Sequence, residues 1–252
     1  MYGHLFEPPA AVVGPSGYKD APRPFVFRPR SLEERPVAAG SILTLDIHLF
    51  DLDPARPEQL TSALARWAVD GLGPSYGSAE LALAEQIGLD GSVSRVIFDG
   101  RESFAAGPAQ IVPLAAQPGP PLRELTVEFL SPTELKGEEF SVKSPGFGPL
   151  FGRALERVST LARLYNGQAP EVDFRGLIAD ARAVSVAEWS MRPLQRQRVS
   201  ANTGDRHSLG GLVGRVRYTG DELRPFLPWL EAAVWTGVGR QTVWGKGEIR
   251  IS

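Results

Sequence analysis

The sequence predicts an α+β protein made of two domains with related architecture. Three observations carry this prediction: short segments in which apolar and polar residues alternate, longer segments with apolar residues every three or four positions, and a stretch rich in Pro and Gly at residues 107–121. The first pattern is typical of half-buried strands and the second of amphipathic helices. The length of 252 residues allows two domains of about 100–150 residues, so we expect domains over 1–106 and 122–252 with 107–121 as linker.

The first domain begins with irregular chain rich in Pro and Gly, interrupted by a short strand at 25–27. Apolar residues at odd positions predict a strand over 41–50. A helix then begins with Asp53 as N-cap and Pro54 in its first turn. It ends at Gly71-Leu-Gly73, and strands over 79–87 and 93–98 follow.

The second domain has the clearer pattern. We expect strands over 122–130, 183–191, 211–218 and 248–251, and helices over 149–165 and 221–235. The resulting order, βαββαβ, is the ferredoxin-like or RRM-like split unit. Both halves close with a helix, a pair of nearby glycines and a strand, so we expect tandem ferredoxin-like units. The first unit lacks a recognisable opening strand and helix.

Composition excludes several classes of protein and site. There is no Cys, which excludes thiolate chemistry and zinc fingers, and His4, His48 and His207 are the three histidines, so we expect neither a metal site nor a cofactor. No apolar run reaches the roughly 20 residues of a membrane-spanning helix. No signal peptide is recognisable, and a cytoplasmic protein without a membrane partner is the expectation. The acid pair Asp51 and Asp53 is better explained by helix capping than by metal binding.

A glycine-rich loop is the most specific motif. It reads Gly237-Val-Gly239-Arg-Gln-Thr-Val-Trp-Gly245-Lys-Gly247. Glycines allow positive φ and close backbone approach, and successive amides can bind an anion. The loop is neither a P-loop nor a dinucleotide fingerprint, because its helix comes before the glycines. A helix C-cap and turn is the structural alternative. We expect the loop amides to face an anion.

The segment between Trp189 and Tyr218 is rich in arginine: it contains six Arg residues and a single acidic residue, Asp205. Arg215 and Arg217 share one face of the predicted strand 211–218. The guanidinium fork suits phosphate binding and base stacking. The alternative is a genome that encodes Arg in place of Lys, since only four Lys occur and the formal net charge is −2.

These features resemble the CRISPR-associated endoribonucleases that process precursor crRNA, within the RAMP superfamily. The Gly-rich loop is that family's signature, and the resemblance covers about residues 125–251, with a weaker likeness over 2–100. It includes Phe129-Leu-Ser-Pro-Thr, Leu209-Gly-Gly-Leu-Val-Gly214 and Phe226-Leu-Pro-Trp-Leu. Three departures stand out. Arg198-Val-Ser200 lacks a following Arg-Gln pair, Lys246 replaces an apolar residue, and the chain begins at a segment that relatives precede with a strand and a helix.

The resemblance implies cleavage of CRISPR repeat RNA by its own 2′-OH without a metal, giving a 2′,3′-cyclic phosphate and a 5′-OH. The implied partners are repeat RNA in precursor crRNA and other CRISPR effector subunits. A non-catalytic subunit that binds crRNA and a ferredoxin-like domain that binds a small anion are the alternatives. The residues we expect to contact RNA are Arg198, Arg206, Gly210, Gly211, Arg215, Arg217, Gly237, Gly239, Arg240, Gln241, Gly245, Lys246 and Gly247.

His207 is the candidate general base or acid, since an unperturbed imidazole titrates near pH 6.5. It lies in Gly204-Asp-Arg-His-Ser208, beside the Arg cluster and ahead of the Gly-Gly strand. The alternative for His207 is a solvated loop residue. His48, on the polar side of a strand, is expected to be structural or to face RNA.

Overall fold

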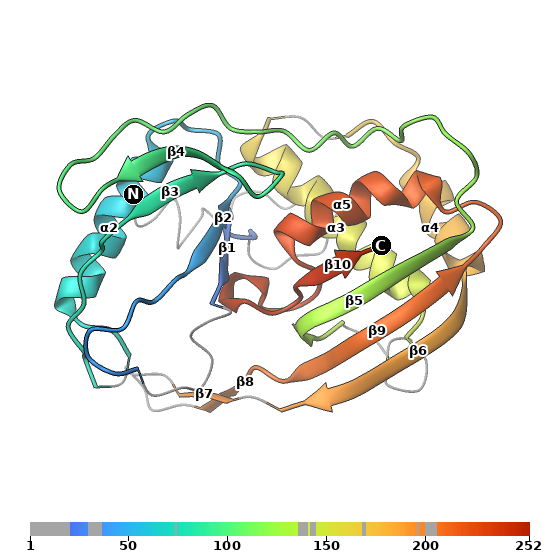
Figure 1. The fold of residues 1–252 in the computed structure, drawn as a ribbon. Coiled ribbons are helices and arrows are strands. Elements are labelled where there is room, and N and C mark those ends of the chain that lie inside the picture. The colour runs from blue at the N-terminus through green and yellow to red at the C-terminus, as the bar shows by residue number, and fades with distance from the viewer. Residues whose placement is uncertain are drawn as a thin grey trace. The chain divides into compact units, whose positions relative to one another are not determined.

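Four antiparallel strands in the order β10-β5-β9-β6 form the main sheet of the computed structural model (Figure 1). Their bounds are β5 Glu124–Thr133, β6 Ser185–Leu194, β9 Gly211–Thr219 and β10 Ile249–Ile251. The structure describes residues 21–29, 37–73, 75–135, 141, 145–167, 170–195, 197–199 and 206–252. Helices α3 Phe147–Tyr165 and α4 Phe174–Ala183 lie between β5 and β6 in the chain, and α5 Leu227–Thr236 lies between β9 and β10.

This order confirms the predicted ferredoxin-like unit. The first strand of the unit, β5, lies between the third (β9) and the fourth (β10), as the split βαβ arrangement requires. The register pairs Val127 with Val216 and Leu125 with Tyr218, so apolar residues of both strands face the helices. Arg215 and Arg217 point to the opposite face because side chains alternate along a strand.

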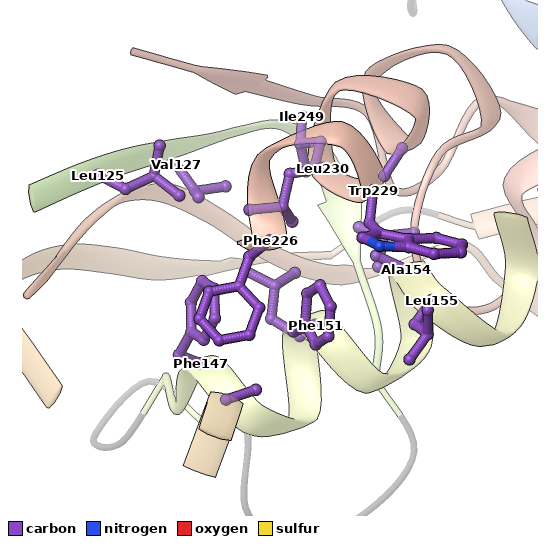
Figure 2. Packing of buried hydrophobic residues seen from close by; sticks show 14 of the residues in the cluster. Leu125, Val127, Phe147, Phe151, Ala154, Leu155, Phe226, Trp229, Leu230 and Ile249 are labelled. Carbon is purple, nitrogen blue, oxygen red and sulfur yellow. The ribbon is translucent and has the colours of Figure 1, made fainter. Parts of the chain in front are cut away.

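The core lies between this sheet and helices α3 and α5 (Figure 2). Phe147, Phe151 and Phe226 form an aromatic cluster whose ring centroids lie 4.7 to 5.9 Å apart; Phe147 and Phe151 are stacked, and Phe226 meets both edge to face. Tyr218 joins this cluster with its ring 5.0 Å from Phe147, and its hydroxyl donates to the Pro145 carbonyl oxygen at 2.9 Å. The apolar period of α3 predicted from the sequence therefore marks the face that is buried.

The described residues form two compact units, one over 51–111 and a larger one that joins the described part of 2–50 to 112–252. The smaller unit holds helix α2 Arg56–Asp70 and the antiparallel pair β3 Ala84–Ile87 and β4 Val93–Phe98. In the larger unit, β1 Phe25–Arg28 pairs with β2 Asp46–Leu49, and β7 Gln197–Val199 pairs with β8 Arg206–Ser208. The helix, glycine turn and strand at Gly71 reproduce locally the arrangement at Gly237, which agrees with the predicted tandem units.

Several predicted boundaries are wrong, each for a local reason. The N-cap of α2 is Ala55 rather than Asp53, because the Asp53 carboxylate accepts from the Ala55 amide and closes a turn before the helix. Pro57, not Pro54, lies in its first turn. The strand predicted over 41–50 shortens to β2, because its partner β1 ends at Arg28, just before Pro29, which has no amide to donate.

The sequence analysis also missed helix α4 and the β7–β8 pair. Helix α4 has a clear start signal, because the Asp173 carboxylate accepts from the amides of Arg175 and Gly176. The helix predicted over 221–235 begins later, as a 3-10 turn (η1, Arg224–Phe226) that leads into α5. Among the described residues, no helix is long and apolar enough to cross a membrane.

Candidate functional site

The glycine-rich loop connects α5 to β10 and contains a 3-10 turn, η2 Thr242–Trp244. Its four glycines all have positive φ: 73° at Gly237, 90° at Gly239, 85° at Gly245 and 71° at Gly247. Gln241 is left-handed as well, with φ of 57°. A side chain at two of these glycines would also meet backbone. A Cβ at Gly239 would lie 2.5 Å from the Glu134 carbonyl oxygen, and one at Gly247 would overlap the Val238 carbonyl. The loop therefore requires glycine for conformation and for space.

Six of the eleven amides in 237–247 donate to backbone carbonyls of the protein, so those six do not face an anion as we expected. Val238 N donates to Gly247 O at 2.9 Å, Arg240 N to Glu134 O at 3.0 Å and Gly247 N to Pro132 O at 3.1 Å. Within the turn, Trp244 N donates to Gln241 O and Gly245 N to Thr242 O, each at 3.0 Å. The glycines thus shape the loop, and its side chains are what it presents.

Three side chains cap the carbonyl end of α5 directly before the loop. Arg28 Nη2 lies 3.5 Å from the carbonyl oxygens of Val234 and Trp235, and Arg157 Nε donates to Thr236 O at 2.8 Å. His48 Nδ1 lies 2.7 Å from Trp235 O. Cations and donors are favoured here by the helix dipole and by the unpaired carbonyls. Strands β1 and β2 and helix α3 thereby fix where the loop begins.

His48 is a neutral donor in this arrangement. Burial lowers its pKa most, the Trp235 hydrogen bond acts to raise it, and the charge of Arg28 lowers it again, so that the pKa lies below the ordinary 6.5. A carbonyl can only accept, so Nδ1 carries the proton and Nε2 keeps its lone pair. The imidazole ring also packs against the Trp235 ring, with centroids 5.0 Å apart. The expected structural role of His48 has a physical basis in these contacts.

The β1–β2 pair packs against the 3-10 turn of the loop. Phe25 and Val243 form a small buried cluster, against which Phe27, Ile47 and Leu49 pack. A Cβ at Gly245 would lie 2.9 Å from Pro29 Cδ. The loop is therefore a packed element rather than a free connection.

An open groove of about 600 Å³ lies beside the loop. The ends of β5, β6 and β9, with Ser208 of β8 and two loop residues, line it: Thr133, Glu134, Leu135, Pro193, Leu194, Gln195, Ser208, Gly210, Gly211, Leu212, Arg240 and Gln241. Gly211 allows β9 to approach β5 closely, because a Cβ there would lie 2.7 Å from the backbone of Thr133. The groove brings Gly210, Gly211, Arg240 and Gln241 of the predicted site together.

One acidic residue, Glu134, meets the two cations of the loop. Its Oε1 accepts from Arg240 Nη1 at 2.6 Å and its Oε2 from Lys246 Nζ at 2.9 Å, while Lys246 also donates to Gln241 Oε1 at 3.0 Å. Partial burial acts to raise the pKa of Glu134, but Lys246 and Arg240 together hold it below its ordinary value. Lys246 is only 2% exposed, so its burial argues against the direct RNA contact expected from the sequence.

The other predicted residues lie elsewhere. Arg217 lies on the open face of the sheet between Glu188 and Glu124, at 3.2 and 3.3 Å, and these partners raise its pKa. Arg215 is exposed on the same face and, like Arg217, is not among the residues that line the groove. Within β7 and β8, the backbone register pairs Arg198 with His207, and Arg206 precedes His207. His4 lies outside the described residues.

Glu134, Arg28 and Arg157 are the residues of the site that sequence reasoning missed. Glu134 directly follows the Phe129-Leu-Ser-Pro-Thr segment, but no local pattern links it to a loop more than 100 residues away.

In the parts of the chain that the structure describes, no group of three or more His, Asp or Glu side chains is arranged to hold a metal ion.

Comparisons with solved structures show that other proteins share this fold. Cas6 TTHA0078 in a product complex is 19% identical, with a TM-score of 0.52 over 92% of this chain and 83% of that one. The product complex of Cas6 TTHB231 from Thermus thermophilus is 17% identical, with a TM-score of 0.51 over 91% and 82%. Both likenesses show the same fold, and no curated protein matches the chain.

Two family models match the sequence itself. Residues 1–109 match a model described as an N-terminal domain. Residues 127–249, which hold the main sheet, the groove and the Gly-rich loop, match the model of the CRISPR-associated endoribonuclease Cas6. This part of the chain, which is just under half of it, is therefore similar to the Cas6-type family of CRISPR-associated RNA-processing proteins.

Proposed function

We propose that this chain is an endoribonuclease that cleaves CRISPR repeat RNA in precursor crRNA. The observation that carries the proposal is the groove beside the Gly-rich loop, in the part of the chain that matches the Cas6 model. Its volume of about 600 Å³ is in the range of small-ligand sites. Arg240 supplies a positive charge at its edge, and Gln195, Ser208 and Gln241 supply neutral polar groups.

The proposed reaction uses the RNA as its own nucleophile. The ribose 2′-oxygen attacks the adjacent phosphorus, a general base accepts the 2′-OH proton, and the bond to the 5′-oxygen breaks as that oxygen is protonated. The products are a 2′,3′-cyclic phosphate and a 5′-OH, so atoms and charge balance without a metal. The protein then has to align the three atoms in line and stabilise the charge on the phosphorane.

The residues proposed for these roles come from the β7–β8 pair and from the Gly-rich loop. His207 is the proposed base or acid, since its neighbour Ser208 lines the groove and since β8 pairs its backbone with that of Arg198. Arg198, Arg206 and Arg240 are proposed to hold phosphates.

The first experiment tests the reaction itself. Purified full chain is incubated with labelled repeat RNA in excess EDTA, and the products are resolved by mass. We expect one cut that leaves a 2′,3′-cyclic phosphate, and no cut when the ribose at that position is 2′-deoxy. Tight binding of repeat RNA without cleavage would instead favour a non-catalytic crRNA-binding subunit, and no binding at all would refute both functions.

The second experiment tests the base with two histidine variants. His207→Ala should lower the cleavage rate by about 10²–10⁴-fold while repeat RNA still binds. His48→Asn, which keeps an N–H donor toward Trp235 O, serves as the matched control and should cleave at close to the wild-type rate. If the rates of the two variants are reversed, His48 rather than His207 is the base.

A further inference from the structure

Glu134 fixes the Gly-rich loop at three points. Its carbonyl accepts from the Arg240 amide at 3.0 Å, and its carboxylate accepts from the Arg240 guanidinium at 2.6 Å and from the Lys246 ammonium at 2.9 Å. Gly239 lacks a Cβ where that same carbonyl approaches. Residue 240 is therefore held to residue 134 through its backbone and its side chain at once.

The two cations of this cluster lie in different surroundings. Lys246 is 2% exposed and pairs with a carboxylate that is 38% exposed, whereas Arg240 is 63% exposed. Two cations share one carboxylate, so the cluster keeps a net positive charge, and Arg240 is its exposed cation. The hydrogen bond to Glu134 uses Nη1, which leaves other guanidinium N–H groups at the edge of the groove.

We propose that Glu134 is a positioning residue for RNA binding: it holds Arg240 so that the remaining guanidinium donors meet a backbone phosphate in the groove. The inference deepens the proposed function and rests on it. A guanidinium held by a carboxylate loses less side-chain freedom when it binds phosphate, and its planar fork suits two parallel bonds to phosphate oxygens.

The sign of the effect separates this role from simple electrostatics. Glu134 is an anion beside a proposed polyanion site, so charge alone predicts that its neutralisation would tighten RNA binding. If Glu134 positions Arg240, its neutralisation weakens binding instead. The structure thus offers a test in which two explanations predict opposite changes in the dissociation constant.

The experiment uses Lys246→Met as background, because removing Glu134 alone would leave Lys246 as a buried, uncompensated charge. Lys246→Met keeps both hydrogen bonds between Glu134 and Arg240. The full chain is titrated into labelled repeat RNA with a 2′-deoxy ribose at the cut, and binding is followed by fluorescence anisotropy. Binding by Lys246→Met is the reference, and we expect the added change Glu134→Gln to weaken it about tenfold.

Two further variants show whether Glu134 acts through Arg240. In the same background, Arg240→Gln should weaken binding to a similar extent, and adding Glu134→Gln to it should then have no further effect. Glu188→Gln, which removes a carboxylate that pairs with Arg217 on the open sheet face, is the matched control and should leave binding unchanged or slightly tighter.

Unchanged or tighter binding after Glu134→Gln would overturn the inference. So would a loss that persists in full in the Arg240→Gln background, because a general distortion of the loop would behave that way. Wild-type chain that fails to bind repeat RNA would overturn the proposed function and this inference together. Failure of the variants alone overturns only the role of Glu134.

Discussion

Replacing Gly239 by Ala tests how tightly the Gly-rich loop is packed. At φ of 90°, an L-residue costs about 1–2 kcal/mol in backbone energy. The new Cβ would also lie 2.5 Å from the Glu134 carbonyl oxygen, whereas real Cβ atoms essentially never come closer than 3.0 Å to such atoms. The loop and the end of β5 must therefore separate by at least about half an ångström.

That separation weakens contacts with known geometry. It lengthens the hydrogen bond from Arg240 N to Glu134 O, now 3.0 Å, and shifts the carboxylate that holds Arg240 and Lys246. Loss of one such backbone bond costs about 1 kcal/mol, and disturbing a charged hydrogen bond to a buried group adds about 1–2 kcal/mol. We therefore expect Gly239→Ala to lower the free energy of unfolding by about 3–5 kcal/mol.

Gly167→Ala provides the matched control. Gly167 follows α3 in the same unit with φ of 75°, and a Cβ there meets nothing within 4 Å. Gly167→Ala should lower the free energy of unfolding only by the backbone energy of an L-residue at positive φ, about 1–2 kcal/mol. Urea unfolding followed by tryptophan fluorescence measures both variants. If Gly239→Ala destabilises the protein no more than Gly167→Ala does, the loop is not packed against β5 as we describe.

Three other predictions concern the sheet, the core and one histidine. His48 has a lowered pKa in the folded protein, so its contribution to stability is fully present above its ordinary pKa of 6.5 and is lost as pH falls below that value. His48→Asn should flatten the fall in melting temperature over that acidic range, and an unchanged slope would assign the dependence to other groups. Phe151→Ala, in the centre of the core, should cost about 3–5 kcal/mol in urea unfolding, and a loss below 1 kcal/mol would contradict the described packing. Arg217→Ala should change the affinity for repeat RNA less than twofold, because Glu124 and Glu188 already neutralise Arg217, and a large loss in anisotropy titrations would place RNA on the open sheet face.

The alternation of β5 and β9 and the period of α3 were predictable, because each reports which face of an element is buried. Those patterns are local, so they can be recognised without knowing which element each strand or helix packs against. Boundaries were less predictable where a neighbour sets them. Strand β2 begins at Asp46 because its antiparallel partner β1 ends at Arg28, and the start of α2 depends on a turn closed by Asp53. Helix α4 was predictable from Asp173 but was missed.

The candidate site, like the fold, was predictable only where its features are local in the sequence. The glycines of the loop are visible in the sequence, since a position that needs positive φ admits few other residues. What those glycines do is decided by the tertiary structure: they let the loop pack against Glu134 and Pro29, and six of the eleven loop amides donate to backbone carbonyls of the protein.

The sequence by itself determined the α+β class, the βαββαβ order of the second domain and the place of the Gly-rich loop, because periodicity and glycine spacing record local geometry. Only the tertiary structure decided which charges are available to a ligand. Lys246 and Arg240 are equivalent cations in the sequence, yet one is buried against Glu134 and the other lies exposed at the groove. The residues next to Arg217 in the sequence offer it no carboxylate, but the adjacent strands bring Glu124 and Glu188 within ion-pair distance. Charge pairing depends on distances between residues far apart in the chain, and those distances exist only once the sheet has formed.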